Sequence, residues 1–293
     1  MEIIKTKDIK NLQFQDLYDF FYSLPSHGFR DFSKDIKTFE NEFINLLEDP
    51  KYGFLFEYKN NKIVNYFLIK NEDSLKRSII MTYDYNKIKS HISEIKEFTQ
   101  SNSLEIGIRN LQKKYFKEIS LFSHIRTYNF MKLNRNKLFN KIYKENFNSE
   151  EVEHEQNYSE LVKIQNECFL DQYGYEENNL SDFKSEIHNL EKRKIKSFFE
   201  ISKVRNNIWS GYTWTQLNLN NFEGKLSMCG VKKEFRNKGI AKPLIVSSIN
   251  RLINSNCKSI SLEVDNENIP AKKIYDDLGF RTYSKLDWFN VKY

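Results

Sequence analysis

The stretch from Val231 to Leu244 combines residue types that hold a phosphate group. Pro243 lacks the backbone N–H that a helix interior needs, so it fits only the first turn of a helix. We therefore expect a helix to begin just before Pro243, directly after a strand over Leu226 to Val231. The unpaired N–H groups and the positive end of the helix dipole would then face one spot, which suits an anion.

The residue types within this loop support the same chemistry. Gly239 and Ala241 let a ligand approach the backbone closely, and Arg236, Lys238 and Lys242 add positive charge. Neither the Walker pattern nor the Gly-x-Gly-x-x-Gly dinucleotide pattern is present. On residue types alone, the alternative is an ordinary basic helix start.

Two motifs resemble those of one enzyme family. Arg236-Asn237-Lys238-Gly239-Ile240-Ala241 is similar to the Arg/Gln-x-x-Gly-x-Gly/Ala signature of the GCN5-related N-acetyltransferases (GNAT), which use acetyl-CoA. The stretch from Ile260 to Phe280 resembles a second signature, in which a strand is followed by Asn268, Ala271, Tyr275 and a closing Gly-Phe. The motifs occur in the family's order, one helix and one strand apart.

The resemblance implies a reaction and its cofactor. The protein would transfer an acetyl group from acetyl-CoA directly to a primary amine of unknown identity, without a nucleophilic side chain. Backbone groups would pair with the pantetheine arm and the pyrophosphate. The implied cofactor-binding residues are Cys229, Gly230, Val231, Arg236, Asn237, Lys238, Gly239, Ile240, Ala241, Lys242 and Asn268.

The resemblance also implies two catalytic residues. Tyr275 matches the family tyrosine that protonates the CoA sulfur, and its alternative role is packing on its helix. Glu263 matches a base that takes the amine proton in some relatives, and its alternative is a structural strand glutamate. Asn268 is either a cofactor contact or only a helix cap.

The acceptor site is less defined by the sequence. Family analogy places it at the early helices, including Phe169 to Tyr175, and at the strand that carries Tyr212 and Trp214. These aromatic residues either shape a pocket or belong to the core. The acceptor is a small-molecule amine or a peptide or protein amine. Two other functions stay open, a transferase for another acyl-CoA and a non-catalytic CoA-binding or protein-interaction module.

The elements that must position these residues recur in both halves. In the first half we predict a helix over Leu12 to Leu24, strands over Glu2 to Lys5, Tyr52 to Glu57, Ile63 to Ile69, Ile79 to Tyr85, Leu104 to Ile108 and Ile125 to Leu133, and helices over Ile88 to Phe98 and Leu111 to Phe122. In the second half we predict strands over Val152 to Gln156, Phe198 to Ser202, Ile208 to Leu217, Leu226 to Val231, Ile260 to Val264, Phe280 to Tyr283 and Trp288 to Val291, with a helix over Tyr158 to Phe169.

The repeated layout predicts two GNAT-like domains of the mixed α/β (α+β) class, each a mostly antiparallel mixed sheet flanked by helices. Residues 148–293 would form the N-acetyltransferase domain. Residues 1–147 would form a degenerate copy, because the first half passes from Tyr85 to Asn86 without a glycine and so lacks the pyrophosphate loop.

Composition limits the other possibilities. The net charge is +6 over 293 residues without a concentrated basic stripe, so we expect no nucleic-acid partner. No apolar run approaches a membrane span, so we expect no membrane partner. The three scattered cysteines fit reduced thiols in the cytoplasm and show no metal-ligand spacing. We expect a cytoplasmic monomer or homodimer.

Overall fold

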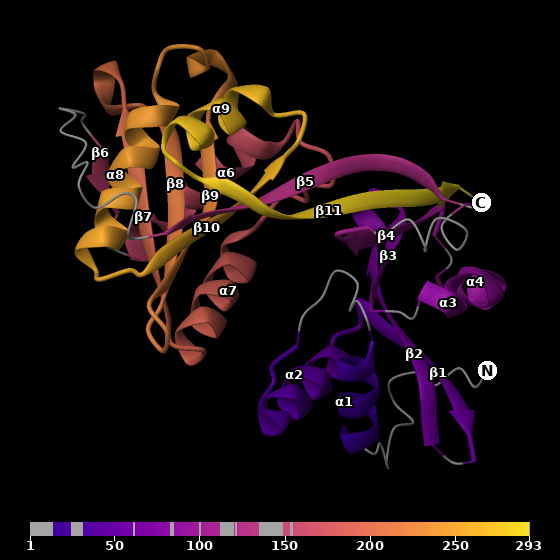
Figure 1. Ribbon diagram of the computed structural model, residues 1–293. Coiled ribbons are helices and arrows are strands. Elements are labelled where there is room, and N and C mark those ends of the chain that lie inside the picture. Colours follow the sequence, from indigo (N-terminus) through magenta and orange to yellow (C-terminus); the bar gives the residue numbers. More distant parts are fainter. Residues whose placement is uncertain are drawn as a thin grey trace. The chain divides into compact units, whose positions relative to one another are not determined.

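The computed structural model describes residues 14–24, 32–60, 62–82, 85–99, 101–111, 120, 122–134, 149–152 and 155–292 (Figure 1). The chain divides into two compact units, which we treat separately. Unit 1 comprises Met1–Tyr128 and Ser284–Tyr293, and unit 2 comprises Asn129–Tyr283. The strand predicted over Glu2 to Lys5 and most of the helix predicted over Leu111 to Phe122 lie outside the described residues.

Unit 1 contains a mixed sheet with helices on both faces. Its elements are α1 (Phe14–Ser23), α2 (Ile36–Glu48), β1 (Tyr52–Lys59), β2 (Lys62–Glu72), β3 (Arg77–Thr82), α3 (Tyr85–Ile88), α4 (Ile92–Thr99), β4 (Ser103–Arg109) and the C-terminal part of β11 (Arg281–Lys292). The strand order is β1-β2-β3-β4-β11, and β3 and β4 are its parallel pair. Successive β2 residues face opposite cores, since Phe67 packs with α4 whereas Tyr66 packs with α1 and α2.

Unit 2 has a similar plan, and the helix that follows its strand β9 is longer than the helices α3 and α4 that follow β3 in unit 1. Its elements are the end of β5 (Ser123–Asn134), β6 (Ser149–Glu151), α6 (Tyr158–Phe169), α7 (Leu180–Lys192), β7 (Ile195–Lys203), β8 (Trp209–Asn218), β9 (Glu223–Val231), α8 (Ala241–Asn254), β10 (Ser259–Asp265), α9 (Ile269–Asp277) and the start of β11. The order is β5-β10-β9-β8-β7-β6, with β9 and β10 parallel and β6 to β9 antiparallel. The predicted fold class, a mixed α/β architecture of mostly antiparallel sheet flanked by helices, is confirmed.

The two faces of the unit 2 sheet have different helices. Phe198 packs in the core beneath α8 and α9, whereas the next residue, Phe199, packs in the core beneath α6 and α7. This alternation along a strand buries both faces. The helix α6 has the bounds predicted from the sequence, and Pro243 lies in the first turn of α8 as expected.

Two strands contribute to both units. The strand β5 begins in unit 1, but its Met131 and Leu133 are buried in the core of unit 2. The strand β11 begins in unit 2, and Phe289 near its end is buried in unit 1, where Leu286 to Lys292 pair with β4. The units therefore differ from the contiguous halves 1–147 and 148–293. That the first half is a degenerate copy stays a prediction.

Several element predictions were wrong. The predicted closing pair of strands, Phe280 to Tyr283 and Trp288 to Val291, is one continuous strand, β11. The opening strand of the second half is Ser149–Glu151 rather than Val152 to Gln156, because a 3₁₀ turn at Glu155–Asn157 leads into α6. Tyr85, predicted at the end of a strand, begins α3.

Two helices were missed although their sequences signal them. In α7, the buried residues Phe183, Ile187 and Leu190 recur at helical spacing, and the Asn179 side chain caps the helix by accepting from the Asp182 N–H at 2.9 Å. The helix α2 is built alike, with Asp35 as its cap. None of the described helices is long and apolar enough to cross a lipid bilayer.

Candidate active site

The site begins where β9 and β10 separate. Their parallel pairing joins Glu223–Leu226 to Ser259–Leu262, although β9 continues to Val231 and β10 to Asp265. On its other side β9 has a bulge, since Trp214 pairs with Met228 and Thr215 with Leu226, which leaves Ser227 as the extra residue. A bulge bends its strand, and a cavity of about 380 Å³ opens beside this part of β9.

The cavity collects the residues that the sequence singled out for the cofactor. All of them except Lys238 line it: Cys229, Gly230, Val231, Arg236, Asn237, Gly239, Ile240, Ala241, Lys242 and Asn268. The ammonium nitrogen of Lys238 instead lies 5.1 Å from the centre of the Phe235 ring. Two separate motifs, one after β9 and one after β10, thus meet at one cavity.

The loop before α8 has the backbone that an anion site requires. Gly239 has φ +76°, a left-handed conformation that glycine adopts without strain, and a Cβ built there would meet nothing within 4 Å. The helix α8 begins at Ala241, and no side chain among the described residues caps its start. The first N–H groups of a 14-residue helix therefore lie beside the cavity.

Tyr275 also lines the cavity, from the helix α9. The side chain is buried, and burial raises the pKa of its hydroxyl well above the usual value, with a smaller contribution from the Cys229 thiol. The hydroxyl is therefore protonated at neutral pH and available as a hydrogen donor. The Asn268 side chain caps α9 by accepting from the Ala271 N–H at 3.2 Å, so Asn268 is a cap as well as a wall residue.

Glu263 lies elsewhere. It is exposed on β10 and does not line the cavity. Among the described residues that line the cavity there is no aspartate, glutamate or histidine.

Further wall residues had not been assigned to the cofactor from the sequence: Cys168, Gln172, Phe235, Ile245, Pro270, Ala271 and Ile274. Ala271 precedes Tyr275 by one helical turn, so helical spacing alone would have placed it on the same face. Gln172 lies in the stretch Phe169 to Tyr175 that family analogy assigned to the acceptor, whereas Cys168, in the last turn of α6, carries no such signal. Burial raises the pKa of Cys168 and of Cys229 to about 12, so neither thiol is a ready nucleophile.

The aromatic residues predicted for the acceptor site have different surroundings. Tyr212 and Trp214 are buried in the core, where the Tyr212 hydroxyl lies 3.1 Å from the Met228 sulfur and the Trp214 indole donates to Ser197 at 3.1 Å. The stretch after Phe169 is not helical but connects α6 to α7. Within it the Tyr175 hydroxyl donates to Asn166 at 2.7 Å, and Tyr173 is 39% exposed.

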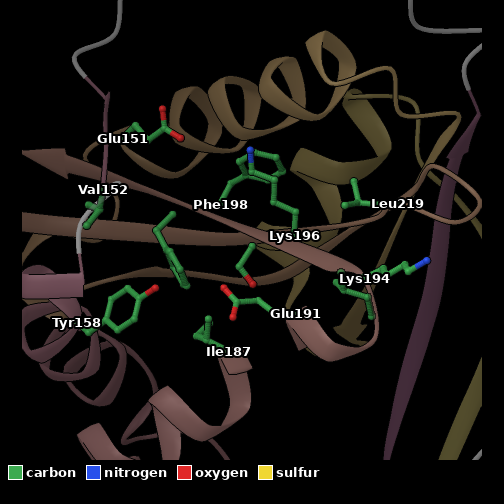
Figure 2. Close-up of a pocket in the computed structure, with 12 residues that line it drawn as sticks. Glu151, Val152, Tyr158, Ile187, Glu191, Lys194, Lys196, Phe198 and Leu219 are labelled. Carbon is green, nitrogen blue, oxygen red and sulfur yellow. The ribbon is translucent and has the colours of Figure 1, made fainter. Parts of the chain in front are cut away.

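A second hollow of about 480 Å³ lies at β7, away from β9 (Figure 2). Figure 2 shows Tyr158 and Glu191 below the strand and Lys196 beside Phe198. Burial raises the pKa of the Tyr158 hydroxyl, and the charges of Glu155 and Glu191 add to the effect. The hollow contains none of the predicted site residues, so the cavity beside β9 is the candidate active site.

The chain is similar to known acetyltransferases over part of its length. Residues 142–280 match the acetyltransferase (GNAT) family. The N-alpha-acetyltransferase MAK3 of Arabidopsis thaliana is 36% identical over 65 residues, which cover 22% of this chain and 34% of the relative. The N-alpha-acetyltransferase 30 of Schizosaccharomyces pombe is 35% identical over 63 residues, which cover 22% and 42%. Both matches therefore span less than half of the relative's length.

The fold has a solved counterpart. A tandem GNAT protein from the clavulanic acid biosynthesis pathway, solved without AcCoA, superposes with a TM-score of 0.67 at 10% identity, covering 99% of this chain and 97% of that one. At this identity the likeness concerns the fold alone. Together with the two motifs at the cavity, the family match shows that residues 142–280 contain a domain similar to the acetyltransferase (GNAT) family.

Proposed function

We propose that the protein is an N-acetyltransferase that binds acetyl-CoA in the cavity between β9 and α9 and transfers the acetyl group to a primary amine. The observation that carries this proposal is the meeting of two motifs at one cavity beside the start of α8. The family's members use acetyl-CoA as their donor. The sequence-based expectations of a cytoplasmic protein and of a monomer or homodimer are part of the same proposal.

The residues of the cavity fit the parts of this cofactor. The diphosphate would bind the N–H groups at the start of α8 and the open loop at Gly239, with Lys242 adding charge. The pantetheine arm would pair with the backbone of Cys229 to Val231, which lies beyond the end of the β10 pairing. Acetyl-CoA supplies the activated thioester, and the protein supplies binding and orientation.

Tyr275 would act as the proton donor. The amine nitrogen forms a bond to the acetyl carbonyl carbon, the carbon–sulfur bond breaks, and the sulfur takes a proton. A buried, protonated hydroxyl on the cavity wall suits this role. The amine proton leaves on the acceptor side to water or to Glu263, since no described carboxylate lines the cavity.

For the acceptor we propose the α-amine of a peptide or protein N-terminus. The support is that the two curated relatives are N-alpha-acetyltransferases. A small-molecule amine and a different acyl-CoA are the alternatives within the enzyme class. A non-catalytic CoA-binding module is the alternative outside it.

Two measurements test the proposal. Thermal unfolding with acetyl-CoA, and with ATP and NAD as anion controls, tests the donor, because a ligand at about 100 times its Kd adds about 2.7 kcal/mol of stability. Release of CoA thiol with short peptides that carry a free N-terminus, and with the same peptides N-acetylated, then tests the acceptor. Binding of acetyl-CoA without thiol release for any peptide or small amine would favour the non-catalytic module.

A further inference from the structure

Three cationic side chains of the loop after β9 reach the end of α6. The Lys232 ammonium lies 2.5 Å from the Glu167 carboxylate, and the Lys233 ammonium lies 3.3 Å from that of Asp171. The Arg236 guanidinium donates through Nη2 to the Cys168 carbonyl at 3.0 Å. Its Nε donates at 3.1 Å to the carbonyl of Val231, the last residue of β9.

These three contacts differ in how much they stabilise the packing of the loop on α6. The side chains of Lys233 and Asp171 are 76% and 56% exposed, and such surface pairs contribute little. Arg236 instead donates to a carbonyl in the last turn of α6, where the helix leaves its own acceptors without intrahelical partners. A cation at this end also complements the negative pole of the helix dipole. Of the three, Arg236 is the one that donates to the backbone of α6, whereas Lys232 and Lys233 pair with carboxylate side chains.

The backbone of β9 at Gly230 packs closely against the last turn of α6. A Cβ built on Gly230 would lie 2.6 Å from the Cys168 Cβ and 2.9 Å from the Phe169 ring. The last turn of α6 thus lies directly on β9 where the strand passes the cavity. Arg236 fixes this packing by bonding to α6 and to the end of β9 together.

The segment between α6 and α7, residues 170–179, depends on the same helical turn. The Asn166 side chain accepts from the Tyr175 hydroxyl at 2.7 Å and from the Asn178 N–H at 3.0 Å, and it donates to the Asn178 carbonyl at 2.9 Å. Leu170 is 60% exposed and Tyr173 is 39% exposed on this segment. The segment therefore presents apolar surface from a backbone that is anchored on α6.

We propose that Arg236 is a positioning residue, which holds the last turn of α6 and with it residues 170–179 in register with the cofactor loop. Two of its donors serve protein carbonyls rather than the diphosphate. In the proposed function, on which this part rests, the segment would carry the acceptor, so Arg236 sets the affinity for the amine more than the affinity for acetyl-CoA.

The test compares R236K, R236M and the matched control R281M. Arg281 also donates from its guanidinium to two backbone carbonyls, those of Asp276 at 3.2 Å and Phe280 at 2.7 Å, but it does not line the cavity. Hydrogen exchange of residues 166–179 is measured without any ligand. We expect R236K and R236M to speed exchange there about tenfold or more, and R281M to leave it unchanged. If R236M does not fold, R236K carries the test.

Kinetics with acetyl-CoA and the best peptide from the thiol-release screen give the second readout. Both Arg236 variants should raise the acceptor KM about tenfold and change the acetyl-CoA Kd less than about threefold. The proposal would be overturned if R236K had the same exchange rates and the same acceptor KM as the unmodified protein, because lysine keeps the charge of arginine but not its paired donors. Hydrogen exchange is measured without ligand, so it tests the role of Arg236 even if acetyl-CoA does not bind. Failure of the proposed function would show only in the binding and kinetic measurements.

Discussion

Replacing Gly239 by alanine tests whether its loop binds the ligand, provided that the strain of the left-handed backbone is measured separately at a second glycine. Gly239 has φ +76° and lines the cavity, and a new Cβ would meet no protein atom within 4 Å. Gly279 offers a matched control. It has φ +91°, its new Cβ would meet only the Leu133 side chain at an ordinary 3.5 Å, and it does not line the cavity.

The expected magnitudes follow from this geometry. Each substitution places an L-residue in the left-handed region, which costs roughly 1–2 kcal/mol. At about 2–4 °C per kcal/mol for a domain of this size, both variants should lower Tm by roughly 2–8 °C. Only at Gly239 does the methyl group enter the proposed diphosphate site. Losing one hydrogen bond to a charged group costs about 1.5–3 kcal/mol, so the acetyl-CoA Kd should rise roughly 10- to 150-fold.

The assay is thermal unfolding of each variant without ligand, followed by an acetyl-CoA titration. Gly239→Ala should lose most of the ligand-induced rise in Tm, whereas Gly279→Ala should keep it. The assignment of the loop to the diphosphate would be refuted if Gly239→Ala bound acetyl-CoA as tightly as the unmodified protein. Equal losses of affinity in both variants would point to general destabilisation instead.

Four other predictions concern the cavity and the cores. Tyr275→Phe should slow acetyl transfer about 100-fold with an unchanged acetyl-CoA Kd, and an unaltered rate would remove Tyr275 from the mechanism. Because burial raises the pKa of Tyr275, the folded protein keeps this proton where the unfolded chain loses it, so in urea titrations stability should fall more steeply above about pH 10 in the unmodified protein than in Tyr275→Phe. Gly230→Ala should cost about 1–3 kcal/mol in urea unfolding, because its Cβ overlaps Cys168, and full stability would contradict that packing. Leu133→Ala should destabilise unit 2 by about 2–5 kcal/mol, measured by hydrogen exchange in β10, although Leu133 belongs to a strand that begins in unit 1.

Local signals in the sequence were sufficient for the parts of the site that depend on neighbouring residues. Pro243 located the start of α8, and Asn268, named as a possible helix cap, caps α9. Gly239 was singled out for close approach, and its backbone has the expected freedom. Each of these features is decided within one helical turn, where residue type and backbone conformation are directly linked.

Features that depend on distant partners were not predictable in the same way. Cys168 and Gln172 reach the cavity only because α6 packs on β9 at Gly230. Tyr212 and Trp214 are core residues because α6 and α7 cover their face of the sheet. The strand β11 is continuous because its second part pairs with β4, whose residues lie about 180 positions earlier in the chain.

The sharing of β11 sets the order in which the protein can be completed during synthesis. A ribosome releases the chain from its N-terminus forward, and domains generally fold in that order. Leu286 to Lys292, which pair with β4 and include the buried Phe289, are made after all of unit 2. Unit 1 is therefore synthesised first but completed last, and the edge of β4 that pairs with β11 stays unpaired until the end of the chain has been made.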